Sequence, residues 1–337
     1  MKIKRRGLSG LAVGMTLALG LTACSSEGGA RNEEQAAGGG GGASVGSAGT
    51  EQVTIAMITH EAPGDTFWDK IRAGAETAAQ ALNVDLQYSN NQEAPEQATL
   101  VQNAVDQQVD GIAVTLAYAN QVGPAAQAAA ESGIPVVAFN SGIGVYEDYG
   151  ISMYFGSDED LAGQSLGERI AAEPGFQKAV CIIQEQGSVA LEARCDGVAT
   201  GTGGRSEVVN VEGTDLPSVR ATLGAKLQQD PSVTHLIALG APIALEALAA
   251  KGEANSEAQV VTFDLNADVA QAIADGEIAF SVDQQPYVQG FMAVQSLWAN
   301  LTNGNDIGGG LPVLTGPSFV DSKNIEQILP YAGNNTR

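Results

Sequence analysis

Short apolar runs rich in β-branched residues alternate with Ala-rich segments of helical spacing through most of this 337-residue chain. An apolar run of about four to eight residues is typical of a strand buried on both faces, as in parallel sheets covered by helices. The pattern therefore predicts an α/β fold. Strands are expected at 53–59, 84–88, 111–116, 135–139, 179–183, 208–211, 235–239, 259–263 and 278–282, and helices at 66–82, 94–108, 121–132, 158–172, 216–229, 243–250 and 267–274.

The number of strand–helix units is too high for one ordinary sheet. The units divide near Gly156 into two similar runs of about four or five each. Two sheets, each with helices on both faces, are therefore predicted. A single closed barrel of strand–helix units is the alternative, and alternation alone does not exclude it.

The first 50 residues lie outside this pattern and predict export. A basic segment at 2–6 precedes an apolar run at 8–21, which is too short to span a bilayer and fits the core of a signal peptide. The run ends in Leu21-Thr22-Ala23-Cys24, which resembles a bacterial lipobox, where the signal is cut before a cysteine that carries lipid. We expect a signal peptide at 1–23 and lipidation of Cys24, with an ordinary secretory signal as the alternative.

Residues 24–50 are almost all small or polar and predict a flexible tether. No other stretch is long and apolar enough to span a bilayer, so the protein would be held by lipid alone at the extracytoplasmic face of the cell membrane. With Cys24 lipidated, Cys181 and Cys195 remain as a pair in an oxidising compartment, and we expect a disulfide between them. Two buried free thiols are the alternative.

The charge of the chain excludes a nucleic-acid partner. Lys and Arg total 16 against 39 Asp and Glu, for a net charge of −23, and four of the basic residues lie within the first six positions. A phosphate-backbone binder needs a basic face, which this composition does not supply. Two His and three Cys also leave little material for a metal cluster. We therefore predict no metal and no cofactor.

Polar and aromatic side chains follow the ends of several expected strands, where ligands bind in open α/β sheets. Amide and carboxyl groups match the donors and acceptors of hydroxyl groups, and an aromatic face covers the apolar side of a sugar ring. The set predicts a site for an uncharged polyhydroxylated solute. Its members are His60, Asp65, Phe67, Trp68, Asn140, the segment 184–186, Asp264 and Gln284.

A serine hydrolase is the main catalytic alternative. Residues 163–167 match the nucleophile motif G-x-S-x-G, but they lie inside the helix expected from 158 rather than at a strand-to-helix turn. Their glycines are instead expected to allow close helix packing. No phosphate-binding loop occurs. We therefore predict that the protein is not an enzyme.

Several blocks, taken in order over about 53–320, resemble the type I periplasmic sugar-binding proteins of bacterial ABC importers, of the ribose-binding kind. The resemblance lies in Ile55–Ile58 with Asp65–Trp68, Ile134–Asn140, Ala193–Gly197, Val260–Asp264 and Asp283–Tyr287. It implies two Rossmann-like lobes joined by three hinge crossovers. The first lobe would be 51–156 plus 284–311, and the second 157–283 plus 312–330.

The resemblance also implies a function and a set of contacts. A monomeric receptor would capture a sugar or sugar-like polyol in the cleft between its lobes, close over it and deliver it to a membrane permease. A sensory receptor for such a solute is the alternative. Phe67 and Trp68 would stack on the ring, and hydroxyls would bond to Asn140, Arg194, Asp264 and Gln284. We expect Asp264 to face Arg194, so that each charge has a partner. Ribose itself is not implied, since the ribose binders have Asp-Arg where this chain has Asn140-Ser141.

Overall fold

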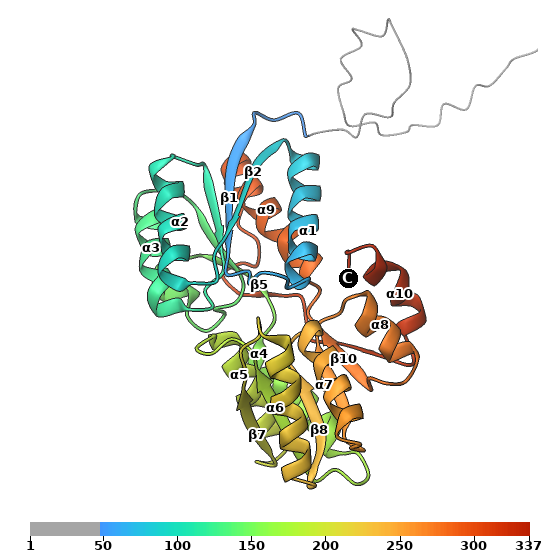
Figure 1. The fold of residues 1–337 in the computed structure, drawn as a ribbon. Coiled ribbons are helices and arrows are strands. Elements are labelled where there is room, and N and C mark those ends of the chain that lie inside the picture. The colour runs from blue at the N-terminus through green and yellow to red at the C-terminus, as the bar shows by residue number, and fades with distance from the viewer. Residues whose placement is uncertain (1–47) are drawn as a thin grey trace, which may run out of the picture. The chain divides into compact units, whose positions relative to one another are not determined.

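The computed structural model describes residues 48–337 (Figure 1). The expected signal peptide at 1–23, the lipid attachment at Cys24 and the tether up to residue 47 lie outside the described residues. The last part of the expected tether is in fact bound to the folded chain. The backbone N–H of Ala48 donates to the carbonyl oxygen of Ala81 at 2.9 Å, and Trp298 Nε1 donates to Thr50 Oγ1 at 3.3 Å.

The first sheet has six strands in the order β11-β5-β4-β3-β1-β2, and all its neighbours are parallel. Its strands are β1 (Val53–Thr59), β2 (Val84–Asn90), β3 (Gly111–Val114), β4 (Val136–Asn140), β5 (Met153–Gly156) and β11 (Val313–Leu314). The helices that belong to it are α1 (Phe67–Leu82), α2 (Ala94–Asp106), α3 (Ala119–Glu131) and α9 (Pro286–Asn303), with a short 3-10 helix at Tyr146–Tyr149.

The second sheet also has six strands, in the order β12-β10-β9-β8-β6-β7. Only β12 is antiparallel to its neighbour. Its strands are β6 (Lys178–Ile183), β7 (Ser206–Asn210), β8 (Val233–Ala238), β9 (Gln259–Phe263), β10 (Phe280–Asp283) and β12 (Ser318–Asp321). Its helices are α4 (Glu159–Ala171), α5 (Val189–Gly201), α6 (Leu216–Gln229), α7 (Ala241–Glu253), α8 (Ala267–Ala274) and α10 (Ile325–Gly333). Two separate sheets with matching strand order confirm the two-lobed fold and exclude the barrel.

Each sheet is apolar on both faces because helices cover both. In β1, Ile55 and Met57 pack in the core beneath α1 and α9, while Ala56 and Ile58 pack in the core beneath α2 and α3. Successive side chains of a strand point to opposite faces, so a run without polar positions is what two covered faces require. Within residues 48–337, no helix combines the length and the hydropathy needed to cross a membrane.

Glycines let the α4 and α5 helices approach closely, as expected for the 163–167 motif. A Cβ at Gly163 would overlap the carbonyl oxygen of Arg194, and one at Gly197 would overlap that of Asp160. The expected disulfide also ties α5 to its sheet. Cys181 on β6 is bonded to Cys195 on α5, with their Cα atoms 5.8 Å apart.

Three crossovers connect the lobes, at 157–158, 284–285 and 315–317 (Figure 1). The third comes later than expected, since 312–314 was assigned to the second lobe. Val313 and Leu314 instead pair with β5 and complete the edge of the first sheet. The second and third crossovers are bonded to each other, because Gln285 Nε2 donates to the carbonyl oxygen of Thr315 at 2.6 Å.

Candidate functional site

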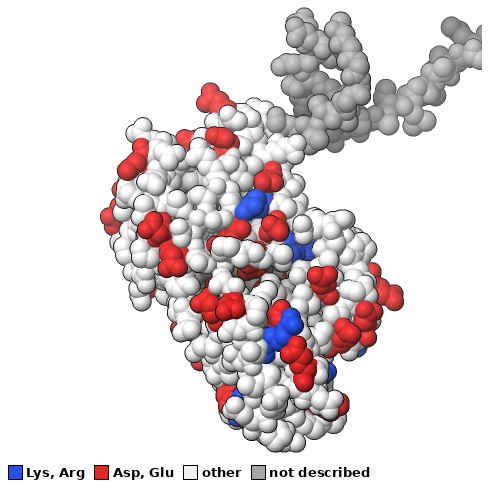
Figure 2. All heavy atoms as spheres, viewed as in Figure 1, with Lys and Arg blue, Asp and Glu red and all other residues white. Residues whose placement is uncertain are grey.

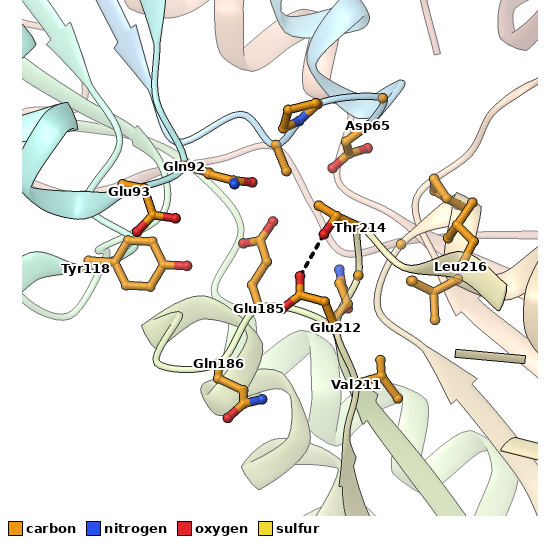
Figure 3. Close-up of a pocket in the computed structure, with 18 residues that line it drawn as sticks. Asp65, Gln92, Glu93, Tyr118, Glu185, Gln186, Val211, Glu212, Thr214 and Leu216 are labelled. Carbon is orange, nitrogen blue, oxygen red and sulfur yellow. Dashed lines mark hydrogen bonds between the residues drawn. The ribbon is translucent and has the colours of Figure 1, made fainter. Parts of the chain in front are cut away.

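A cavity of about 580 Å³ lies between loops that follow strands of both sheets (Figure 3). On the first lobe, residues 62–65 follow β1, residues 92–93 follow β2 and Tyr118 follows β3. On the second lobe, the lining residues follow β6, β7 and β8 and are Gln184, Glu185, Gln186, Val211, Glu212, Gly213, Thr214, Leu216, Gly240, Pro242 and Ile243. The carboxyl ends of the strands in the two sheets therefore face each other across this space.

The cavity is acidic. Asp65 and Glu93 line it from the first lobe, and Glu185 and Glu212 line it from the second, while none of its lining residues is Lys or Arg. Figure 3 shows the Glu185 side chain in the middle of the opening, between Tyr118 and Thr214. Figure 2 shows many acidic and few basic side chains on the visible face, in keeping with the net charge.

Of the eight individual residues predicted to bind ligand, only Asp65 lines this cavity, and the predicted segment 184–186 lines it as well. Its Oδ1 accepts from the backbone N–H of Phe67 at 3.0 Å, which also orders the start of α1. Burial raises the pKa of Asp65, whereas the hydrogen bond from the Phe67 N–H lowers it. The other seven are buried. They are His60, Phe67, Trp68, Asn140, Arg194, Asp264 and Gln284.

The predicted aromatic residues Phe67 and Trp68 lie together with His60 after the end of β1. The ring of Trp68 meets the ring of Phe67 edge-on at 5.2 Å between centroids, and it meets the ring of His60 in the same way at 4.8 Å. Phe67 and Trp68 also belong to the core between the first sheet and α1. Their positions are therefore fixed by packing.

The side chain of Gln284 connects the amide of Asn140 on the first lobe with the carboxyl group of Asp264 on the second lobe. Its Oε1 accepts from Asn140 Nδ2 at 3.4 Å, and its Nε2 donates to Asp264 Oδ1 at 2.8 Å. Gln289 Nε2 also donates to Gln284 Oε1, at 3.0 Å. Asn140 and Asp264 both have left-handed backbones, with φ of 63° and 65° at the ends of β4 and β9. Three of the predicted side chains thus form one buried network at the second crossover.

The expected pairing of Asp264 with Arg194 is wrong. Arg194 makes its hydrogen bonds to Glu159 and to the carbonyl oxygen of Leu239. Glu159 lies in the first turn of α4, and Gly163 brings that helix close to α5. Burial raises the pKa of Asp264 to about 7, although the charge of Arg194 acts in the opposite direction. The charge of Arg194 thus acts on Asp264, but the hydrogen bonds of Arg194 go to other groups.

Lys70 is a site residue that the sequence reasoning missed. It is fully buried on α1, and its Nζ donates to the carbonyl oxygen of Thr66 at 3.1 Å. Burial lowers the pKa of Lys70, and the carboxylates of Asp264 and Asp65 oppose that shift. A lysine of the first lobe therefore supplies positive charge near the acidic groups of the second.

The cavity-lining residues Tyr118, Glu93 and Glu212 were also missed, whereas Glu185 belongs to the predicted segment 184–186 without a ligand contact of its own assigned to it. The three missed residues lie just after a strand, so the position rule that selected Asn140 could have found them. Burial and the carboxylate of Asp65 raise the pKa of Glu185 to about 7. In residues 48–337, no group of three or more His, Cys, Asp and Glu side chains is arranged to hold a metal ion.

The chain matches one family model, described as a periplasmic binding protein domain, over residues 55–306. It is 25% identical over 304 residues to the xylose/arabinose-binding protein XylF of Sulfolobus acidocaldarius, a match that covers 84% of this chain and 75% of XylF. It is 23% identical to the ribose import binding protein RbsB of Bacillus subtilis, covering 84% of this chain and 90% of RbsB.

Solved structures resemble it as well. A carbohydrate transporter from Acidothermus cellulolyticus, crystallised in complex with myo-inositol, is 49% identical, with a TM-score of 0.84, and the match covers 85% of this chain and all of that one. A solute-binding protein from Burkholderia graminis, in complex with D-arabinose, has a TM-score of 0.72 at 24% identity, covering 81% of this chain and 96% of that one. The second likeness shows the shared fold.

Proposed function

Because this chain belongs to the periplasmic binding protein domain family, we propose that it is an exported receptor that captures a cyclitol or sugar between its lobes and delivers it to an ABC permease. It is a type I sugar-binding protein of the ribose and xylose kind, and such proteins are solute receptors rather than enzymes. One observation supports the capture step above others. Polar groups from the strand ends of both lobes surround a cavity of about 580 Å³.

Myo-inositol is the ligand that we propose first. The similar transporter structure at 49% identity holds it. Myo-inositol is an uncharged ring with a hydroxyl on every carbon, so it needs many donors and acceptors and an apolar surface over its C–H faces. The network of Asn140, Asp264 and Gln284 offers the first, and the rings of Phe67 and Trp68 offer the second. Pentoses are the alternative, since XylF binds xylose and arabinose.

We propose that the eight predicted residues contact the ligand when the two lobes close over it. In this proposal the first lobe spans 51–156 plus 284–314, the second spans 157–283 plus 315–330, and ligand contacts from both shift an open–closed equilibrium toward the closed form. Two N–H groups of Arg194 are already bonded to Glu159, so only its remaining N–H groups would be available to a ligand hydroxyl.

Calorimetric titration of the purified protein with myo-inositol, D-xylose, D-ribose, D-arabinose and D-glucose tests the proposal. We expect saturable one-site binding, tightest for myo-inositol. The variant Asn140→Ala should weaken it, whereas Asp148→Ala, at an exposed site on the 3-10 helix, should not. Absence of binding to every member of the panel would refute the proposed function.

The anchoring step of the proposal rests on the sequence of the N-terminal segment. Replacement of Cys24 by Ser should move the protein from the membrane fraction of the expressing cell to the soluble extracytoplasmic fraction. Ser25→Ala is the matched control and should leave it membrane-bound. Persistence of Cys24→Ser in the membrane fraction would refute lipid attachment. We also propose that the receptor is a monomer, and light scattering with and without ligand measures this directly.

A further inference from the structure

A buried hydrogen-bond chain in the first lobe holds His60. Gln97 on α2, Thr115 after β3 and His60 after β1 are all shielded from solvent. Gln97 Nε2 donates to the carbonyl oxygen of Thr115 and to Thr115 Oγ1, each at 3.0 Å. The same Oγ1 lies 2.7 Å from Nδ1 of His60. One hydroxyl therefore stands between an amide and an imidazole.

The direction of this chain follows from what each group can donate. A backbone carbonyl only accepts, so the Gln97 side chain must turn its NH₂ group, and not its oxygen, toward Thr115. The Thr115 hydroxyl then accepts from Gln97 through one lone pair, and among the hydrogen bonds of the described residues its own proton has no acceptor other than His60 Nδ1. An imidazole nitrogen that accepts carries no proton, so neutral His60 holds its proton on Nε2. Burial lowers the pKa of His60 to about 3, which keeps the ring neutral.

The proton on Nε2 is directed across the cleft. Nε2 of His60 lies 3.9 Å from Oε2 of Glu185, which follows β6 in the second lobe. The lobes touch beside this pair, because the N–H of Val189 donates to the carbonyl oxygen of Ala117 at 3.0 Å. A separation of 3.9 Å is too long for a direct hydrogen bond, and a gap of that size between a donor and an acceptor suits a bridging oxygen.

We propose that His60 and Glu185 close the cleft over one ligand hydroxyl, which accepts from His60 Nε2–H and donates to Glu185, and that Gln97 and Thr115 are positioning residues that keep His60 in the donating tautomer. The proposal rests on the proposed capture of a polyol. It adds a specificity rule: the bridging group must both accept and donate, so a hydrogen or a methoxy group at that ring position fails.

The surroundings of the pair favour an uncharged hydroxyl at this point. The rings of Trp68 and Tyr118 each form a T-shaped pair with the His60 ring, at 4.8 and 6.4 Å between centroids. The charged groups around Glu185 are Asp65 from the first lobe, which repels its carboxylate, and Arg194 from the second, which attracts it. Burial and the carboxylates of Glu185, Glu93 and Glu212 raise the pKa of Tyr118. An anionic ligand group would meet this cluster unfavourably.

The first test determines by NMR which ring nitrogen of His60 carries the proton. Because His60 and His235 are the two histidines of the chain, imidazole nitrogen NMR of ¹⁵N-labelled full-length protein gives two ring systems, which H235Q assigns. We expect His60 to show a protonated Nε2 and an unprotonated Nδ1. T115V should move the proton toward Nδ1 or mix the tautomers, whereas T115S should preserve the wild-type pattern. A proton on Nδ1 in the wild type would overturn the proposal.

The second test measures how much the proposed bridging contact contributes to ligand affinity. We expect T115V and E185Q to weaken myo-inositol binding about tenfold or more, mainly through faster dissociation, and T115S to stay within about twofold. T234V is the matched control, since Thr234 bonds to Nδ1 of His235 outside the cleft, at 3.0 Å. Among singly deoxygenated inositols, the one that lacks the bridging hydroxyl should bind wild type more weakly and be insensitive to T115V and E185Q.

The outcomes separate this inference from the proposed function. Myo-inositol binding that T115V and E185Q leave within twofold would overturn the bridge while the receptor function stands. If no polyol binds the wild type, both fail, whatever the NMR pattern is. If thermal unfolding shows that T115V does not fold, Q97M removes the donor that orients the Thr115 hydroxyl and serves as the second variant.

Discussion

The guanidinium of Arg194 forms two hydrogen bonds to the carboxylate of Glu159, Nε to Oε2 at 2.5 Å and Nη2 to Oε1 at 3.1 Å. Both side chains are buried, and the ring of Phe263 lies against the guanidinium, 4.6 Å from its carbon to the ring centroid. The arrangement joins α4 to α5 and leaves Asp264 without a bonded arginine. Arg194 is therefore held in place before any ligand arrives.

Glu159→Gln should be strongly destabilising, because it leaves a buried guanidinium without its compensating charge. Breaking a buried pair by removing one partner costs roughly 3–5 kcal/mol. Urea unfolding at pH 7 measures the loss. Glu246→Gln, which breaks the partly exposed pair with Arg220, is the control and should have a much smaller effect. Equal stability of the two variants would mean that Asp264 compensates Arg194 after all.

Gly163→Ala should separate α4 from α5. The added Cβ would overlap the carbonyl oxygen of Arg194, which belongs to the backbone of the facing helix and cannot turn away. Overpacking of this kind typically costs about 1–3 kcal/mol. Gly224→Ala on α6 is the matched control, because nothing lies within 4 Å of its new Cβ. It should stabilise the helix by roughly 0.5–1 kcal/mol. Thermal unfolding compares the two, and the same sign for both would contradict the close helix packing.

The sequence was enough to predict two sheets and nine of their twelve strands, because buried strands such as β9 leave an apolar run that does not depend on distant residues. The strands β5, β11 and β12 were not predicted. The position after a parallel strand is also defined locally, so the sequence indicated which side chains follow the strands, while their contacts with a ligand stay a prediction. The helix α9 was not predicted, although it supplies core residues to the first lobe. It follows Gln285, whose left-handed backbone separates it from β10, and its pattern carries no periodic Ala stripe like that of α3.

The side-chain partners of the predicted residues were harder to predict than their places at the strand ends. Glu159 looks like an ordinary acidic residue in a first helical turn, and it becomes the partner of Arg194 only because glycines bring two helices together. Glu185 lies 3.9 Å from the imidazole of His60, which belongs to the other lobe. Such pairings depend on tertiary packing, which neither spacing nor local propensity encodes.

Asn140→Ala should be more destabilising than Asn140→Gly. Both changes remove the amide that donates to Gln284 and Gln289. Only Ala must also hold a Cβ at a φ of 63°, which costs roughly 1–2 kcal/mol, whereas Gly adopts this conformation freely. Chemical unfolding of the two variants measures the difference. Equal stabilities would show that the backbone at the end of β4 relaxes out of the left-handed region.

Asp264→Asn should change how stability depends on pH. Burial raises the pKa of Asp264 to about 7 in the folded protein, while an unfolded aspartate keeps its usual, lower value. The folded state therefore binds a proton more tightly, so this group's contribution is fully present below about pH 4 and is lost as the pH rises through 7. Asn never ionises, and its oxygen can still accept from Gln284 Nε2.

The variant should accordingly match the wild type near pH 4 and be more stable at pH 8, by roughly 2–4 kcal/mol. Urea unfolding at pH 4, 6 and 8 measures the two curves. Asp148→Asn, at an exposed position, should follow the wild type throughout. Glu185 also titrates near pH 7, but it is present in both proteins, so their difference isolates Asp264. Parallel curves for Asp264→Asn and the wild type would mean that Lys70 or Arg194 keeps this carboxylate ionised across the whole range.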